Sequence, residues 1–316
     1  MKAIYALAIA AAVGGMIYLN TTETVNTEAD FGAFVAEFRK SYFNKEQYNY
    51  RLGVFQANMA KNAEMNANPN DDAVYGVTQF SDWTQEEFSG LLTLTVPAHL
   101  PETDIIYRDV EPVRGESFDW RDKNVMTPVK DQGSCGSCWS FAANEAHESA
   151  WALKTGQIVD LSEQELVDCS TRYGNHGCNG GWYFYAWDYV KAKGGLALEK
   201  DYPYAAKDQT CKTVSKRNAP ITGYSKVSKS DASVKTAIKA EPEAVAVDAS
   251  NWSQYRSGVF SNCSKRINHA VVAVGFTDDY WVIRNSWGKR WGESGFMKIK
   301  MGDTCGIEQY VYKVNV

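Results

Sequence analysis

The chain has 316 residues, a formal net charge of −5 and an isoelectric point near 5.5. This acidic balance argues against nucleic acid or an anionic membrane surface as a general partner. The length exceeds that of a typical single domain, so we expect more than one folded part.

The chain opens with the pattern of an export signal. Lys2 precedes an almost unbroken apolar run over residues 3–19, rich in alanine. One positive charge followed by a short apolar core is typical of a secretory signal peptide, which we assign to residues 1–20. The alternative is a membrane anchor, although these 17 residues are marginal for spanning a bilayer.

Residues 21–112 contain no cysteine and predict two amphipathic helices followed by a short strand over 74–80. Asp30 is the expected cap of the first helix. The residues that recur at helical spacing are Phe31, Phe34, Val35 and Phe38 in the first helix and Tyr48, Leu52, Phe55 and Met59 in the second. Such a segment is either an ordinary helical subdomain or a small fold that docks on the rest of the chain.

The next stretch has the composition of a linker. Three of the eight prolines fall within residues 97–115, where charges are mixed and periodicity is weak. This composition is typical of an exposed connection that is open to proteolysis.

The remainder changes from a helical to a strand pattern near Pro220. A stripe of mostly small residues predicts a buried helix, and Ser162 with Glu165 has the spacing of a capping box at the start of a second helix, 162–169. The stripe consists of Cys138, Ala142, Ala143, Ala146, Ala150 and Leu153. After Pro220, strands are predicted at 244–247, 270–274, 280–284 and 296–301. We therefore expect a helical half followed by a β half.

Seven cysteines lie between residues 135 and 305. An odd count in an exported chain indicates three disulfides and one free thiol, with the pairing left open by the sequence itself. A zinc site at Cys135 and Cys138 lacks a second Cys/His pair. A thioredoxin-like redox pair at the same two residues lacks a strand leading into it.

The most informative stretch is Cys-Gly-Ser-Cys-Trp at residues 135–139. It places Cys138 where a loop gives way to a helical pattern, and free backbone amides there favour a thiolate. The stretch matches the local signature of papain and cathepsin proteases, and His269 and Asn285 follow 131 and 147 residues later, as that signature expects. The chain thus resembles a papain-family (cathepsin L-like) cysteine protease, written as a full precursor.

The resemblance extends to the N-terminal part. Four residues match the interspersed Glu-Arg-Phe-Asn-Ile-Asn pattern of cathepsin L-like propeptides, where Gln47 and Asn62 replace the Glu and the Ile. The matching residues are Arg51, Phe55, Asn58 and Asn66. A neighbouring Gly-x-Asn-x-Phe-x-Asp element is matched by Gly76, Phe80 and Asp82, with Thr78 in place of Asn.

The resemblance implies a domain plan. Residues 21–113 would be an inhibitory, fold-assisting and mainly helical propeptide whose linker, 97–115, crosses the active site and is cut at maturation. Residues 114–316 would be the mature peptidase, an α+β, papain-like fold of two lobes with the active-site cleft between them. The helical lobe would span 114–220 and the antiparallel, β-barrel-like lobe 221–316.

Peptide hydrolysis by a thiol requires a thiolate and a proton carrier. Lowering a cysteine pKa from about 8.5 to about 4 corresponds to roughly 6 kcal/mol, of which a helix N-terminus supplies at most about 2 kcal/mol. An adjacent imidazolium is therefore needed, and we expect His269 to supply it as general acid and base. Outside the family context a lone His before an apolar strand would be read as a core histidine. His99, His147 and His176 have no such context.

The resemblance assigns the supporting residues. Asn285 would hold the histidine ring, Trp287 would cover that bond and border the substrate site, and Gln132 would stabilise the oxyanion together with the Cys138 amide. The residues expected to bind substrate are Gly180, Gly181, Trp182, Tyr183, Ala246, Ile267, Trp287 and Tyr310. The disulfides implied by the family are Cys135–Cys178, Cys169–Cys211 and Cys263–Cys305, which leave Cys138 free.

Three details refine these expectations. Tyr310 at the floor of the pocket for the second residue before the cut favours small or medium aliphatic side chains there. Only eight residues separate Cys169 from Cys178, too few for the occluding loop of dipeptide-removing relatives, so an endopeptidase is favoured. Asn268 stands where many relatives have Asp before the histidine, and we expect an altered pH profile. Asn251-Trp-Ser and Asn262-Cys-Ser are glycosylation sequons, but the middle Trp of the first and the neighbouring disulfide cysteine of the second disfavour them as acceptors.

The expected partners are protein and peptide substrates and the chain's own propeptide. No cofactor, metal, nucleic acid or stable membrane association after signal removal is expected, and the protein should be a monomer in a lysosome-like acidic vesicle or outside the cell. The propeptide should leave at acidic pH. The alternatives are transpeptidation or exopeptidase trimming at the same site, and a decayed homologue that only binds.

Overall fold

The computed structural model describes residues 27–111 and 114–316. The chain divides after Lys40 into two compact units, represented by residues 27–40 and 41–316. The predicted signal peptide lies outside the described residues. Within the described part, no helix is long and apolar enough to cross a membrane.

The first unit is one helix, α1 (Thr27–Glu37). The rings of Phe31 and Phe34 stack at 5.7 Å, and those of Phe34 and Phe38 lie 5.3 Å apart, as the helical spacing predicts. Asp30 is not the cap, because the helix is already formed at Thr27. Asp30 lies instead in the first turn, where a carboxylate interacts favourably with the helix dipole.

The second unit begins with the rest of the N-terminal part, which we call the N-terminal segment (residues 41–111). It contains α2 (Lys45–Asn66), capped by the Asn44 side chain, then β1 (Asp72–Tyr75), α3 (Gln85–Ser89) and β2 (Ile105–Ile106). The predicted strand over 74–80 is therefore wrong in extent. It ends at Tyr75 because the Thr78 and Ser81 side chains bond the local backbone into a turn.

The motif residues of α2 hold this segment together. Arg51 pairs with Glu87 at 2.6 Å, and Asn58 donates to the carbonyls of Ser81 and Trp83 at 2.9 Å. The Asn66 side chain donates to the Tyr75 carbonyl and accepts from the Tyr75 amide, both at 2.8 Å, and so ties the end of α2 to β1.

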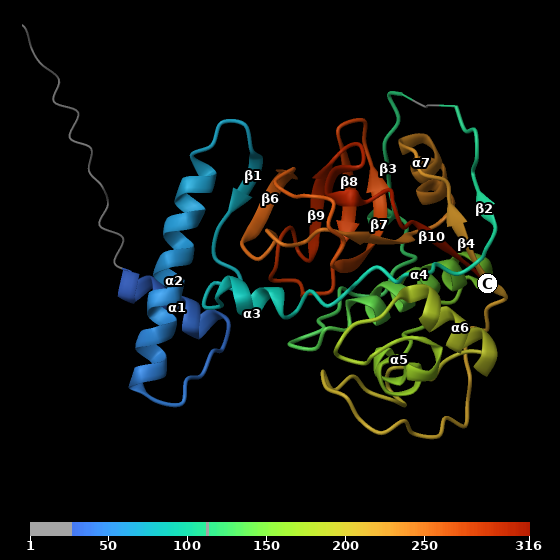
Figure 1. The fold of residues 1–316 in the computed structure, drawn as a ribbon, viewed down its shortest axis with the longest axis horizontal. Coiled ribbons are helices and arrows are strands. Elements are labelled where there is room, and N and C mark those ends of the chain that lie inside the picture. The colour runs from blue at the N-terminus through green and yellow to red at the C-terminus, as the bar shows by residue number, and fades with distance from the viewer. Residues whose placement is uncertain (1–26, 112–113) are drawn as a thin grey trace, which may run out of the picture. The chain divides into compact units, whose positions relative to one another are not determined.

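Apart from the short β3 before α4 and the helix α7 after β4, the remaining residues form helices first and strands later, as predicted. The helices are α4 (Cys138–Thr155), α5 (Glu163–Cys169), α6 (Tyr183–Lys193) and α7 (Asp231–Ala240). The strands are β3 (Phe118–Asp119), β4 (Gly223–Val227), β5 (Glu243–Val247), β6 (Tyr255–Phe260), β7 (His269–Phe276), β8 (Tyr280–Arg284), β9 (Phe296–Lys300) and β10 (Tyr312–Asn315). Figure 1 shows α4, α5 and α6 gathered in one lobe and the strands with α7 in the other.

One mixed sheet runs through the β lobe in the order β1-β6-β9-β8-β7-β5-β10-β4-β2, with β3 paired to β7. Both end strands come from the N-terminal segment. β1 pairs antiparallel with β6, and β2 pairs parallel with β4. The N-terminal segment therefore protects both edges of the sheet that the later residues build.

The predicted stripe on α4 is mostly correct. Cys138 and the four alanines are buried, but Leu153 is 39 % exposed, because it lies near the C-terminal end of the helix. Helix α7 was not predicted, although Val234, Ala237 and Ile238 show the helical spacing and Ser230 caps it. It is an α-helix within the β lobe.

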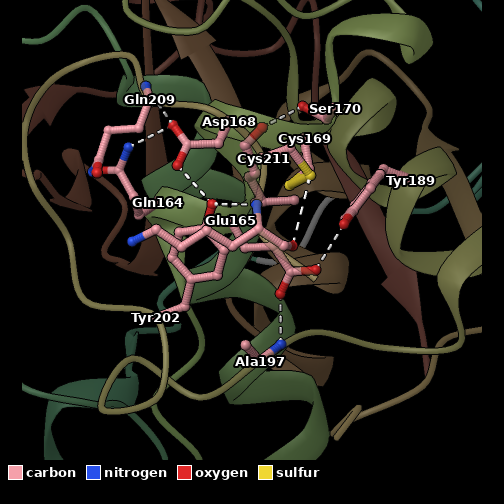
Figure 2. Close-up of a disulfide and its surroundings, with 12 residues drawn as sticks. Gln164, Glu165, Asp168, Cys169, Ser170, Tyr189, Ala197, Tyr202, Gln209 and Cys211 are labelled. Atoms are coloured by element: carbon pink, nitrogen blue, oxygen red, sulfur yellow. Dashed lines mark hydrogen bonds between the residues drawn. A yellow bond between two sulfur atoms is a disulfide. The ribbon is translucent and has the colours of Figure 1, made fainter. Parts of the chain in front are cut away.

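The capping box predicted at Ser162 is only half formed. The Ser162 side chain accepts from the Glu165 amide at 3.0 Å, but the Glu165 carboxylate does not return to the cap. It accepts from the Tyr189 hydroxyl and the Ala197 amide at 2.7 Å and pairs with Arg217. Figure 2 shows this carboxylate beside the disulfide that closes the end of α5.

Three disulfides join Cys135 to Cys178, Cys169 to Cys211 and Cys263 to Cys305, and Cys138 remains free. This is the pairing that the family resemblance implied. Because the sulfur of Cys135 is bonded to Cys178, neither a zinc site nor a redox pair at Cys135 and Cys138 fits the structure.

Candidate active site

Cys138 is the first residue of α4, and Ser137 is its N-cap. The cysteine is fully buried where α4 packs against β7. Its thiol lies within hydrogen-bonding reach of the backbone amide of Ala270, the residue that follows His269 on β7. The helix start thus brings the single free thiol to the start of the strand that carries the histidine.

His269 is held by Asn285. Its Nε2 lies 2.9 Å from Asn285 Oδ1, and that oxygen also accepts from the Ser286 amide at 2.8 Å. Because the amide oxygen accepts, the imidazole must donate from Nε2, which leaves Nδ1 as the basic nitrogen. Among the described residues Nδ1 has no hydrogen-bond partner. The ring is therefore oriented with a lone pair available for a proton.

Aromatic rings enclose this histidine. Trp287 stacks on the imidazole at 4.8 Å with an interplanar angle of 29°, and Trp252 meets it edge-on at 6.0 Å. Trp287 and Trp252 are also in edge contact with each other at 6.2 Å. Trp287 thus packs on the ring whose bond to Asn285 it was expected to cover; Trp252 was missed because no motif marks it.

Gln132 is fully buried six residues before Cys138. Its Nε2 donates to the Cys135 carbonyl at 3.0 Å, and its Oε1 accepts from the Ser286 hydroxyl at 2.8 Å. An amide nitrogen carries two hydrogens, so one remains for a further acceptor. Ser286, which fixes the orientation of this amide, was not singled out in the sequence.

In the precursor, burial shifts the pKa values of both groups away from the ion pair expected for catalysis. Burial raises the pKa of the Cys138 thiol to about 12, although the backbone amides of Ala270 and Trp139 lower it. Burial also lowers the pKa of His269 to about 4, against the bond from Asn285, which raises it. The thiol and the imidazole are therefore both neutral at neutral pH in this structure, because both are shut away from water.

A stretch that we call the crossing segment (residues 91–95) lies against residues that neighbour this buried pair. The Leu94 amide donates to the Asn268 carbonyl at 3.2 Å, and the Thr95 carbonyl accepts from Trp182 Nε1 at 2.8 Å. Thr93 donates its hydroxyl to the Gly136 carbonyl at 2.8 Å. The prediction that residues 97–115 cross the site is wrong, since the chain crosses earlier.

The site's glycines make this approach possible. A Cβ on Gly180 would lie 2.4 Å from the Thr93 carbonyl oxygen, and Gly180 has φ of +106°, a conformation that glycine adopts readily. Gly181 lies next to it, where a Cβ would collide with the Asn175 side chain. Of the two glycines predicted to bind a substrate backbone, Gly180 therefore faces the backbone of the crossing segment, and Gly181 faces the Asn175 side chain.

The residues predicted for the specificity pocket are partly brought together. Trp182 lies 5.5 Å from Tyr183 and 5.2 Å from Tyr310, ring to ring, and the Tyr183 hydroxyl donates to the Tyr310 carbonyl. Ala246 on β5 pairs with Ala270, one residue after His269. Ile267 is buried two residues before the histidine.

Asn268 connects the histidine to a buried carboxylate that sequence reasoning missed. Its Nδ2 donates to Asp248 Oδ1 at 3.2 Å and to the Ser250 hydroxyl at 2.8 Å. Asp248 also accepts from the backbone and hydroxyl groups of Ser250 and Ser264, which hold the pKa of this carboxyl below its usual value despite its burial. The side chain of Asn268 therefore carries no charge of its own and instead donates a hydrogen bond to the carboxylate of Asp248.

The N-terminal segment packs against Trp287, the ring that stacks on His269. Phe80 and Phe88 meet Trp287 edge-on at 5.3 and 5.4 Å, and the Gln79 side chain donates to the Trp287 carbonyl. Thr78, which replaces the Asn of the propeptide element, donates to the Ser253 carbonyl at 2.6 Å. The segment therefore packs on the outer face of the residue that covers the histidine.

Two family profiles match the chain. The one described as "Papain family cysteine protease" matches residues 114–314, and "Cathepsin propeptide inhibitor domain (I29)" matches residues 31–88. Among similar proteins, Cathepsin L 1 of Paramecium tetraurelia is 43 % identical over 308 residues, covering 93 % of this chain and 96 % of the relative. Cysteine proteinase 15A of Pisum sativum is 41 % identical over 319 residues, covering 92 % and 87 %.

Solved precursor structures show the same fold. Digestive procathepsin L 3 of Tenebrio molitor larval midgut superposes with a TM-score of 0.84 at 34 % identity, covering 92 % of this chain and 99 % of the other. A recombinant stem bromelain precursor also gives 0.84, at 33 % identity and the same coverage.

Proposed function

Because the chain belongs to the papain family of cysteine proteases and carries a cathepsin propeptide inhibitor domain, we propose that it is a thiol-dependent endopeptidase made as a zymogen. The observation that carries this proposal is the imidazole of His269, which Asn285 holds and whose Nδ1 has no hydrogen-bond partner among the described residues. The backbone amide of the next residue, Ala270, interacts with the one free thiol, Cys138. This arrangement provides a nucleophile and a base oriented by a third group.

In the proposed reaction, the mature enzyme ionises Cys138 against His269, and the thiolate attacks the scissile carbonyl carbon. The oxyanion is stabilised by the free hydrogen of Gln132 Nε2 and by the Cys138 amide; removing one such donor typically costs about 2.7–4 kcal/mol. His269 then protonates the leaving amine, which yields a thioester acyl-enzyme. Water activated by the same imidazole hydrolyses the thioester and restores the thiol.

The zymogen part of the proposal follows from the covered site. We assign residues 1–20 to the signal, 21–113 to the propeptide and 114–316 to the mature enzyme, and we place the protein on the secretory route to an acidic vesicle or the outside. The N-terminal segment would inhibit in two ways. It occupies the substrate backbone positions at Gly180 and Asn268, and its cover keeps the thiol and imidazole neutral.

Substrate preference follows from the proposed pocket. Tyr310, in ring contact with Trp182, would leave room for small or medium aliphatic side chains at the second residue before the cut. In a panel of fluorogenic dipeptides we expect Val or Leu to exceed Phe and Arg at that position. The Tyr310→Ala variant should gain relative activity on Phe, and a wild-type preference for Arg would contradict the pocket assignment.

The function is tested by incubating the expressed precursor near pH 4–5 with a fluorogenic dipeptide, with Cys138→Ala beside it. Activity that appears in the wild type as the propeptide is lost, and that is absent from the Cys138→Ala variant before and after incubation, supports the proposal. Wild-type precursor that is folded and stripped of its propeptide by another protease, yet inactive, would contradict it. Mass analysis of the products of a long peptide separates internal cleavage from end trimming and from transpeptidation.

A further inference from the structure

The linker re-enters the body of the protein at Gly115. The Gly115 amide nitrogen lies 2.5 Å from Asp278 Oδ2. Asp278 is in the turn between β7 and β8, and its other oxygen accepts from Lys235 Nζ of α7 at 3.1 Å. Gly115 and Asp278 are both exposed, so the peptide bond that precedes Gly115 and the Asp278 carboxylate are both accessible from solvent.

From this point the chain stays attached to the β lobe. Glu116 pairs with Lys239 at 2.6 Å, and β3 then pairs with β7. Gly115 is thus the first residue of a continuous series of contacts with the lobe. Its φ of +72° is one that glycine adopts readily, and it aims the nitrogen at the carboxylate.

We propose that maturation ends at the Arg114–Gly115 bond, one residue after the boundary assigned above, and that Asp278 binds the α-ammonium group formed on Gly115. In this hydrolysis, which rests on the proposed protease function, water adds its hydroxyl to the Arg114 carbonyl and the C–N bond breaks. Arg114 leaves as a carboxylate with the propeptide, and the Gly115 nitrogen takes up protons to become an ammonium. A neutral N–H···carboxylate bond becomes an ion pair between the same two atoms.

The argument is one of position and charge. A mature chain beginning at Glu116 would lose the bond to Asp278, and one beginning at Arg114 would keep only its neutral form. The charges around Asp278 also stay balanced. Lys235 and the Arg114 guanidinium both favour the carboxylate in the precursor, and their field together with the Gly115 amide holds the pKa of Asp278 below its usual value. After the cut the ammonium replaces the departing arginine.

The first test is the identity of the mature N-terminus. Wild-type precursor is matured at acidic pH and its product is analysed by intact mass and N-terminal sequencing. The inference expects a chain that begins at Gly115. A homogeneous product with any other first residue overturns it while leaving the protease function intact. A precursor that never cleaves itself counts against the proposed function instead.

The second test is the state of the new amine. Mature enzyme, inactivated by alkylation of Cys138, is labelled at its α-amine near pH 7 with an acetylating ester that reacts only with the free base. An ion pair raises the amine pKa, and each unit slows labelling about tenfold. We expect the wild type to label at least threefold more slowly than Asp278→Asn.

The matched control is Asp279→Asn, which makes the same charge change one residue along, at an exposed carboxylate. It should label like the wild type. The stability of the mature protein gives an independent readout: Asp278→Asn should lower Tm by about 1–3 °C near pH 6, and the difference should shrink above pH 9, where the amine is neutral. Equal labelling in all three proteins would overturn the ion pair.

Discussion

At the scale of single residues, the two groups expected to react are both buried in the precursor. Cys138 and His269 need charge to act, yet both are buried and neutral beneath the crossing segment. A helix N-terminus and nearby backbone amides are present as predicted, but they do not outweigh the loss of water around the thiol. The sequence predicts the reactive pair; the cover decides its charge.

The first prediction concerns the reactivity of Cys138. With a thiol pKa of about 12, the thiolate fraction at pH 7 is about 10⁻⁵, and only the thiolate is nucleophilic. Iodoacetamide should therefore alkylate the precursor roughly 10³-fold more slowly than an ordinary cysteine of pKa about 8.5. Removal of the propeptide should raise the rate sharply. Glutathione is the reference, and a precursor that reacts as fast as glutathione would contradict the burial argument.

At the scale of elements, β1, α3 and the turn between them form the anchor of the N-terminal segment. The strand extends the sheet at β6, and the aromatic residues that follow pack on Trp287. Backbone pairing sets the register while ring packing supplies apolar burial, so the two contributions can be removed separately.

Removing the ring contact should speed activation. Phe88 is 1 % exposed and in edge contact with Trp287, and Phe→Ala at such positions costs about 3–5 kcal/mol. The Phe88→Ala precursor should lose its propeptide at least tenfold faster at a pH where the wild type activates slowly. Phe43→Ala is the control, since Phe43 is 94 % exposed. Equal activation times for the two variants would show that this contact is not an anchor.

Blocking the strand pairing should act on the precursor alone. A Cβ at Gly258 would lie 2.1 Å from the Asp72 carbonyl oxygen on β1, so Gly258→Ala cannot keep the β1–β6 register. The clash is with the propeptide and disappears once it leaves, although φ of +83° still costs about 1 kcal/mol. We expect faster activation with kcat/KM of the mature enzyme unchanged. Unaltered activation kinetics would mean that β1 contributes nothing to docking.

At the scale of the whole molecule, acid should release the propeptide from the active site at a pH where the enzyme itself stays folded. His269 has a pKa of about 4 in the covered state, below its usual value near 6.5, so uncovering is favoured as pH falls from 6.5 to 4, by up to about 3 kcal/mol. Burial lowers the pKa of His147 in α4 to about 4 as well, so this residue opposes folding of the enzyme itself as pH falls from 6.5 to 4. Burial raises the pKa of Glu145 to about 7, although Arg284, 3.1 Å away, lowers it, so this carboxyl opposes folding less at acidic pH than at neutral pH.

The corresponding measurement is hydrogen exchange of the Cys138→Ala precursor between pH 7 and 4, corrected for intrinsic rates. Protection of the Leu94 amide, which donates to Asn268, should fall through this window while the amides of α4 stay protected. Loss of protection in α4 at the same pH would indicate unfolding of the enzyme and not release of the propeptide.

The sequence by itself determined the parts that depend on local pattern and motif. The Cys-Gly-Ser-Cys-Trp stretch, the distances to His269 and Asn285 and the change from helices to strands are short-range signals, and they predicted the family, the two halves and the order of elements. Its local errors have local causes. Asp30 and Glu165 are good capping residues by type, but the one lies inside an established helix turn and the other is taken by Tyr189 and Ala197.

Only the tertiary structure decided which residues far apart in the sequence contact one another. The crossing segment lies before the proline-rich stretch because hydrogen bonds to Asn268 and Trp182 select residues 91–95, and no composition signal marks them. The neutral thiol, the Asp248–Asn268 bond and the Gly115–Asp278 contact join residues far apart in the chain. Burial and charge depend on every neighbour in space, and for these residues the neighbours exist only after folding.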